Sequence, residues 1–288
     1  MCVVLEYTAV CHNNSVFILD GLSSSELQTG ARLQQDLTDF TNVIGRHNYA
    51  TSFKVDSKAM LIAVLKAIEV QCGAGVLMPA LHFEFHGDPI KGLHVAKSDE
   101  YVSWDELVSY IAPINAASRN NTAVILASCY GYEMASRVKI QHPSPFHFVI
   151  GPSSKISAGA LQDTLLPFYK IMAETGNLES AIRKLDSGFK HFICGEWFFS
   201  SFAAFMVGSF SSKVRAEMVE AIVSSEVAKA GYHNRQLLRQ ARAQARKYLA
   251  RPEEFYLGLS RRFFHGKTPV PYSEFIAFVE NQKLVHNR

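Results

Sequence analysis

MPALHFEFHGDP (residues 78–89) and TAVILASCYGY (residues 122–132) are two short apolar runs, and the predicted fold is built outward from them. Each run is bounded by turn residues, as the buried strands of parallel sheets are. The first run ends at His86-Gly87, and the second ends at Cys129 with Gly131 two residues further on. Neighbouring parallel strands end at the same edge of a sheet, where open α/β sheets hold their ligands. An imidazole and a thiol would therefore lie side by side, as a base and a cysteine nucleophile do.

Strands and helices alternate before the first run. Strands are expected at residues 16–22 and 49–55, and helices start near residues 23–26 and at Asp56 or Ser57. This order predicts a parallel, right-handed α/β sheet with helices on both faces. The first eleven residues, which include three consecutive apolar residues, are a further candidate for an edge strand.

The segment between the two runs predicts a small hairpin at residues 88–102, followed by a helix that Ser103 caps. Another strand is expected at residues 146–150, and it ends at the same sheet edge as the two runs. The backbone that follows it, at Ser153 and Ser154, is therefore a candidate wall of a substrate groove.

Glu84 lies two residues before His86, so both side chains point to the same face of a strand. Glu84 could therefore orient the His86 ring, as the third group of a catalytic triad does. The alternative is that local backbone groups or His82 satisfy this carboxylate. His82 itself is expected to be structural.

Two motifs resemble a known family. Phe83-Glu84-Phe85-His86-Gly87 and Ala127-Ser128-Cys129-Tyr130-Gly131 are similar to the histidine and cysteine motifs of caspase-like (clan CD) cysteine peptidases. The caspase signature is Gln-Ala-Cys-[Arg/Gln/Gly]-Gly with a histidine about 50 residues upstream; here the spacing is 43, and the Cys and the final Gly match. The order of elements resembles the bacterial CHAT-type branch, with residues 176–181 similar to a late helix and residues 201–208 similar to a closing strand.

The resemblance implies a cysteine endopeptidase with a Cys-His dyad acting on a protein or peptide substrate. His86 would share the thiol proton, Cys129 would attack a peptide carbonyl, and the backbone N–H groups of Gly87 and Cys129 would stabilise the oxyanion. Ala127 stands where caspases and metacaspases carry Gln or Asp, so neither of their specificities carries over. Asp163 is a candidate acid of the specificity pocket, and the alternative is an acid near a helix N-terminus. No metal or cofactor is expected.

From Ser211 onward the pattern predicts helices alone, which divides the chain into a peptidase domain (1–210) and a helical extension (211–288). Arg235, Arg239, Arg242 and Arg246 recur at helical spacing and form a basic stripe. The stripe is either a solvated face or a groove for an anion, which could be a nucleotide signal, a nucleic acid or an acidic partner. No long processing linker separates Gly131 from Phe146, so we expect an intact chain whose activity a ligand or partner controls. Bacterial relatives of this kind often act in defence or regulated cell death, and the resemblance implies such gated proteolysis.

The composition bounds the alternatives. With 48% hydrophobic and 19% charged residues, the chain is typical of a soluble protein with a sizeable core. Its net charge of +3 is too small to make a nucleic-acid partner the first expectation. No apolar run reaches the roughly 18 residues of a membrane span, and the longest, at residues 197–210, is predicted to be a buried strand. The five cysteines form no CxxC pattern, as in a cytoplasmic protein with reduced thiols.

Three other functions stay open at this point. Cys2 could become an N-terminal nucleophile after loss of Met1, although the residues after it are more typical of a strand. The fold could also serve as a catalytically silent module that recognises a nucleotide or a protein, although the presence of both His86 and Cys129 argues against this. A Cys-His pair is equally compatible with a hydrolase or acyltransferase that does not act on peptides.

Overall fold

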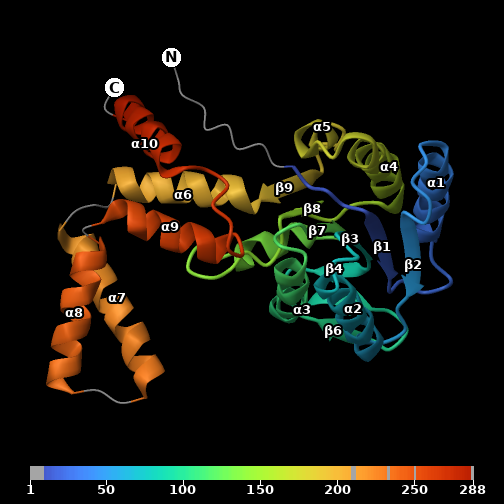
Figure 1. The fold of residues 1–288 in the computed structure, drawn as a ribbon. Coiled ribbons are helices and arrows are strands. Elements are labelled where there is room, and N and C mark those ends of the chain that lie inside the picture. Colours follow the sequence, from blue (N-terminus) through green and yellow to red (C-terminus); the bar gives the residue numbers. More distant parts are fainter. Residues whose placement is uncertain (1–9, 209–211, 232–233, 250, 287–288) are drawn as a thin grey trace. The chain divides into compact units, whose positions relative to one another are not determined.

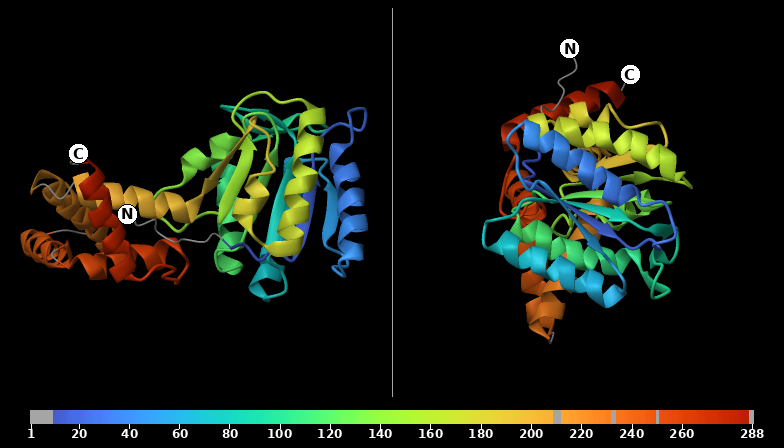
Figure 2. Two further views of the ribbon diagram at one scale, coloured as in Figure 1. Left: turned by 90° about the horizontal axis from the view of Figure 1, so that it is seen from above. Right: turned by 90° about the vertical axis from the view of Figure 1, so that its right-hand side faces the viewer.

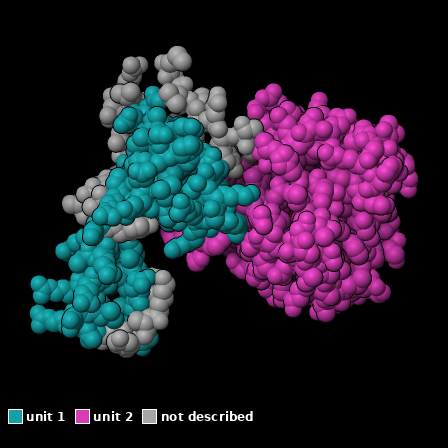
Figure 3. Space-filling view, in the orientation of Figure 1, with its two compact units in different colours: residues 1–7, 196–288 teal, residues 8–195 magenta. Residues whose placement is uncertain are grey.

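The computed structural model describes residues 10–208, 212–231, 234–249 and 251–286. The chain divides into two compact units, residues 8–195 and residues 1–7 with 196–288 (Figure 3). The edge strand predicted for the first eleven residues, and Cys2 with it, falls almost wholly outside the described residues. Val10 makes a single antiparallel bridge to Asn177.

The larger unit is built on a six-stranded sheet in the order β2-β1-β3-β7-β8-β9. Its strands are β1 (Ser15–Asp20), β2 (Ala50–Lys54), β3 (Pro79–Glu84), β7 (Ala123–Ala127), β8 (Phe148–Pro152) and β9 (Phe189–Ile193). The first five strands in this order are parallel to their neighbours, and β9 runs antiparallel to β8. The predicted α/β architecture with a mostly parallel sheet is therefore confirmed.

Helices cover both faces of this sheet (Figures 1 and 2). They are α1 (Thr29–Val43), α2 (Lys58–Gly73), α3 (Trp104–Ala117), the 3-10 helix η1 (Gly131–Arg137), α4 (Ala158–Thr175) and α5 (Leu178–Ile182). Helix α1 packs beside α4 on one face, and α2 packs beside α3 on the other. Every residue of β3 and β7 is buried, which explains why both strands are almost continuously apolar.

Local signals place several elements correctly. The Ser57 side chain accepts a hydrogen bond from the Met60 amide at the start of α2, and Ser103 forms a full capping box with Glu106 at the start of α3. One expected start is wrong. Helix α1 begins at Thr29 after a loop, so residues 23–26 do not open it.

A second, three-stranded sheet follows β3. It consists of β4 (His86–Asp88), β5 (Gly92–Val95) and β6 (Glu100–Val102), which pair antiparallel in that order. This sheet is the predicted hairpin. It leaves His86 in the first strand of the small sheet, directly after the main sheet ends at Glu84.

The smaller unit is helical. It contains α6 (Cys194–Gly208), α7 (Ser212–Ala230), α8 (Arg235–Leu249), α9 (Pro252–Phe263) and α10 (Tyr272–His286). The helices predicted after Ser211 are thus confirmed. Helices α7 and α8 pack against each other as a hairpin (Figure 1).

The strand predicted over residues 197–210, and the closing strand expected at 201–208, are wrong: residues 194–208 form helix α6. Phe198 and Phe202 lie one helical turn apart and stack with a ring-centroid distance of 5.9 Å. Phe198 also packs against Phe263 of α9, and Phe202 packs against Phe275 of α10. This aromatic core belongs to the helical unit, so the boundary falls after Gly195 instead of at residue 210. The strand that closes the sheet is β9.

Among the described residues, no helix combines the length and the apolar character needed to span a bilayer.

Candidate active site

The fold brings His86 and Cys129 to the same edge of the main sheet. Glu84 of β3 is paired with Ala127 of β7, so His86 and Cys129 each follow the last paired residue by two positions. The two backbones are in direct contact there. A Cβ atom on Gly87 would collide with the carbonyl oxygen of Cys129, so only glycine fits next to the histidine. The two predicted strand ends therefore meet as the sequence indicates.

A tight turn fixes the position of the cysteine. Tyr130 has a left-handed backbone conformation (φ 59°), which is strained for a residue with a side chain. Its amide donates a hydrogen bond of 3.2 Å to the carbonyl oxygen of Ser154. Gly131 is required because a Cβ atom there would collide with Leu126. The helix expected at this point is the 3-10 helix η1, and the chain reverses at Tyr130 to leave Cys129 at the tip of the turn.

Cys129 differs from the other described cysteines. It is a free, half-buried thiol, whereas Cys11, Cys72 and Cys194 are free and buried. Burial raises the pKa of Cys72 to about 11 and raises the pKa of Cys194 well above its ordinary value, which makes both poor nucleophiles. The Cys129 Sγ atom lies 3.9 Å from the carbonyl oxygen of Ile156. No backbone carbonyl of the described residues accepts a hydrogen bond from the Cys129 amide.

The carboxylate that contacts His86 is that of Glu26. Glu26 Oε1 lies 2.6 Å from His86 Nε2, and the two side chains are 33% and 54% exposed. The loop between β1 and α1 holds Glu26 in place, because the Ser23 amide donates to Glu26 Oε2 and the Glu26 amide donates to the Ser23 carbonyl. Partial burial alone would raise the pKa of Glu26, but the hydrogen bonds from Ser23 and His86 outweigh it and lower the pKa.

Glu84 is not the group that orients His86. Its Oε1 lies 3.0 Å from His82 Nε2, and its Oε2 accepts a hydrogen bond of 2.8 Å from Thr29. The other nitrogen of His82 is 2.9 Å from the Tyr169 hydroxyl. All four side chains are buried, and they form one connected polar network beneath helices α1 and α4. The alternative reading of Glu84, as a carboxylate satisfied by His82, is the one the structure bears out.

The sequence could have pointed to Glu26 only indirectly. β1 is the parallel neighbour of β3, so the loop after β1 emerges at the edge where His86 lies. A carboxylate in that loop was a candidate partner on topological grounds. The local pattern Ser-Ser-Ser-Glu is typical of helix N-caps, so it predicts a helix start at Glu26 and not a contact with His86.

The residues predicted to line the substrate groove fall into two groups. Ser153 and Ser154 are exposed directly after β8, and the Ser154 carbonyl holds the cysteine turn, so this segment borders Cys129 as expected. Asp163 is exposed in the second turn of α4, and no hydrogen bond or ion pair of the described residues ties it to Cys129 or His86.

The arginine stripe lies on α8 in the helical unit. Arg235, Arg239 and Arg246 are exposed, and Arg242 binds Glu220 of α7 through two hydrogen bonds of 2.7 and 2.8 Å. The hydrogen bond from Arg242 lowers the pKa of Glu220. One of the four arginines therefore joins α7 to α8, and the other three are the ones that face solvent.

Within the described residues, no group of three or more His, Cys, Asp or Glu side chains is arranged to hold a metal ion. Neither the models of known protein families nor the curated proteins give a match to this chain.

Proposed function

We propose that this protein is a cysteine peptidase of the caspase-like kind, with Cys129 as nucleophile, His86 as its base and Glu26 as the group that orients His86. The observation that carries the proposal is the contact of the two strand ends, where the Gly87 backbone packs on the Cys129 backbone. A half-buried thiol, an exposed imidazole and a carboxylate on that imidazole are the parts that an activated cysteine nucleophile needs.

The reaction follows from these positions. Glu26 occupies Nε2 of His86, so Nδ1 is the nitrogen that takes the proton from Cys129 Sγ. The sulfur then forms a bond to the peptide carbonyl carbon, and the oxyanion accepts a hydrogen bond from the Cys129 amide, with the Gly87 amide as the second candidate donor. The C–N bond breaks as His86 gives its proton to the leaving amine. Water next attacks the thioester, releases the carboxylic acid and restores the thiol.

Peptide probes with a cysteine-reactive electrophile test this proposal. We expect labelling at Cys129, identified by mass spectrometry of the digested protein, and we expect Cys129→Ala to abolish both labelling and peptide cleavage. Cys2→Ala and Cys72→Ala serve as matched controls, and both should keep labelling and turnover. Cleavage by Cys129→Ala, or loss of cleavage in Cys2→Ala, would assign the chemistry to another residue.

A further inference from the structure

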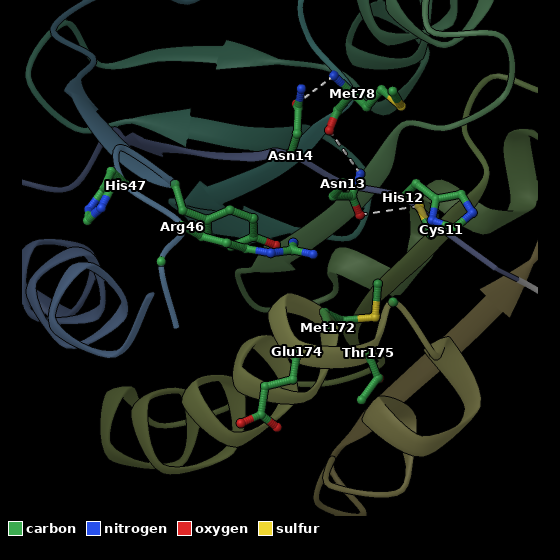
Figure 4. Close-up of a pocket in the computed structure, with 13 residues that line it drawn as sticks. Cys11, His12, Asn13, Asn14, Arg46, His47, Met78, Met172, Glu174 and Thr175 are labelled. Atoms are coloured by element: carbon green, nitrogen blue, oxygen red, sulfur yellow. Dashed lines mark hydrogen bonds between the residues drawn. The ribbon is translucent and has the colours of Figure 1, made fainter. Parts of the chain in front are cut away.

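A cavity of about 520 Å³ lies at the opposite edge of the main sheet from the candidate active site (Figure 4). Asn14, Tyr49 and Met78 line it, and each of them directly precedes a parallel strand, β1, β2 or β3. His86 and Cys129 follow the far ends of the strands, so the two places are separate. The volume is within the range of about 300 to 1,000 Å³ that is typical of small-molecule sites.

The cavity is lined by segments that are far apart in the sequence. They are the chain before β1 (Cys11–Asn14), the chain before β2 (Gly45–His47 with Tyr49), Met78, and the end of α4 with Gly176. Asn13 and Asn14 hold these walls together. Asn13 Nδ2 donates to the Pro79 carbonyl at 2.9 Å, and Asn14 makes hydrogen bonds to the Val76 carbonyl and the Met78 amide. Their amide groups therefore shape the cavity and are engaged with backbone.

The charged group that the cavity offers to a ligand is the guanidinium of Arg46. The Arg46 guanidinium lies 5.8 Å from the centre of the Tyr49 ring, and no carboxylate of the described residues forms an ion pair with it. Glu174 is also in the lining, but Figure 4 shows its carboxylate pointing away from Arg46. Arg46 extends across the cavity in the direction of His12, as the same view shows.

The remaining lining favours the same ligand. Tyr49 is buried, and burial raises its pKa to about 12, so its hydroxyl is a neutral donor. No described residue makes a hydrogen bond with this hydroxyl. Met78 and Met172 add apolar surface that can adapt to a ligand. The cavity thus presents a guanidinium and a hydroxyl donor beside the apolar side chains of Met78 and Met172. The side-chain amides of Asn13 and Asn14 are already hydrogen-bonded to backbone groups.

From this arrangement we propose that the cavity binds a small organic anion, whose phosphate or carboxylate group contacts Arg46 and whose apolar part lies against Met78 and Met172. An arginine side chain suits either group because its planar fork matches both geometrically. The site is independent of the proposed peptidase chemistry, since no residue is shared between them.

Methyl NMR of the full-length protein labelled with [13C-methyl]methionine tests the proposal. The chain has seven methionines, and two of them line the cavity, so Met134 and the others act as internal references. Phenyl phosphate and benzoate are the anionic probes, and benzamide is the neutral one. We expect saturable shifts of the Met78 and Met172 methyl signals with at least one anion, and none with benzamide. The comparison of phenyl phosphate with benzoate tells whether phosphate or carboxylate is preferred.

Arg46→Gln should weaken this binding at least about tenfold, which corresponds to the loss of one charge-assisted contact. Arg32→Gln is the matched control, because Arg32 is an exposed arginine in the first turn of α1, at the end of that helix far from Arg46. The Arg32→Gln variant should bind the anion with the affinity of the unaltered protein. The proposal fails if neither anion shifts the two methyl signals up to its solubility limit. It also fails if benzamide shifts them as strongly, or if Arg46→Gln binds like the unaltered protein.

Discussion

Two histidines, His82 and His86, lie four residues apart in β3 and β4, and each contacts a carboxylate. One of these pairs is buried and the other is exposed to solvent. His82 and Glu84 are 3.0 Å apart with side chains 0% and 3% exposed, whereas His86 and Glu26 are 2.6 Å apart and in contact with solvent. Thr29 of α1 and Tyr169 of α4 complete the first pair, and the edge of the sheet leaves the second one open. The same two residue types therefore serve packing in one place and are accessible to a substrate in the other.

Proximity in sequence therefore does not decide which carboxylate contacts which histidine. Glu84 is two residues from each histidine, but it contacts the buried one. A buried charge or dipole without a partner costs several kcal/mol, so the core takes the nearest carboxylate. The exposed histidine is then satisfied by a carboxylate from a separate loop, sixty positions away in the chain.

The largest expected effect is the loss of peptide cleavage when the exposed histidine, His86, is replaced. His86→Ala should lower peptide cleavage by a factor of about a thousand or more, because the thiol loses its base. Its unfolding free energy should change by less than about 0.5 kcal/mol, since the side chain is exposed. Cleavage kinetics and urea unfolding of the same preparations check this. The double variant with Cys129→Ala should be little worse than either single change, because the two residues act as a unit. A mutant that keeps substantial activity would remove His86 from the mechanism.

The next effect is on stability and concerns the buried pair. Glu84→Ala should destabilise the larger unit by about 3 to 5 kcal/mol, because it leaves His82 and Thr29 buried without their partner. For a unit of this size that corresponds to a lowering of the melting temperature by roughly 10 °C. Differential scanning calorimetry measures it, and Glu26→Ala is the matched control at the exposed pair, with a much smaller shift, because a solvent-exposed pair contributes about 1 kcal/mol or less. Equal shifts in the two variants would mean that the buried network is not stabilising.

Glu26→Gln tests the exposed pair, and we expect a moderate loss of activity. The amide keeps the shape of the side chain and removes its charge, so kcat should fall about 10- to 100-fold while KM changes little, as for other groups that orient a functional histidine. Steady-state kinetics of peptide cleavage by the unaltered protein and by Glu26→Gln measure the change in kcat and KM.

The Glu26 carboxyl also sets how the stability of the native state changes with pH. The pKa of Glu26 is lowered below its ordinary value of 4.5, so its pair stabilises the native state above that pH and loses this contribution as the pH falls through the lowered pKa. An unchanged kcat in Glu26→Gln would reduce Glu26 to a surface contact.

The smallest effect is expected from Tyr169→Phe. The change removes the hydroxyl that lies 2.9 Å from His82 Nδ1 and leaves the rest of the ring in place. The loss should be about 1 to 2 kcal/mol of unfolding free energy, the cost of leaving one buried polar atom without its hydrogen bond. Thermal unfolding monitored by circular dichroism checks it, and catalytic constants should stay at their original values. A drop in kcat without a loss of stability would connect the buried network to the site and contradict the separation of the two pairs.

The sequence alone determined where the candidate site lies in the sheet. Two apolar runs that end in His-Gly and in Cys with a nearby Gly predict parallel strands with reactive residues at one edge, and both the pairing of β3 with β7 and the packing of Gly87 follow this pattern. It also indicated Ser103 as the cap of α3 and narrowed the cap of α2 to Asp56 or Ser57, because capping depends on neighbouring residues. These features are local, or they follow from strand ends that the order of elements fixes.

Contacts between segments that are distant in the sequence became visible only in the folded chain. Glu26 reaches His86 because the loop after β1 returns to the edge of β3, and a pattern of serines could not reveal that contact. Residues 197–208 become a helix because the phenylalanines of α9 and α10 pack against one side of them, whereas their apolar composition by itself fits a strand as well. The cavity around Arg46 likewise needs the ends of α1 and α4 side by side. Contacts of this kind depend on how the elements pack. The free energy of burial follows the apolar area that two packed elements remove from water, and the sequence of a single element does not reveal that area.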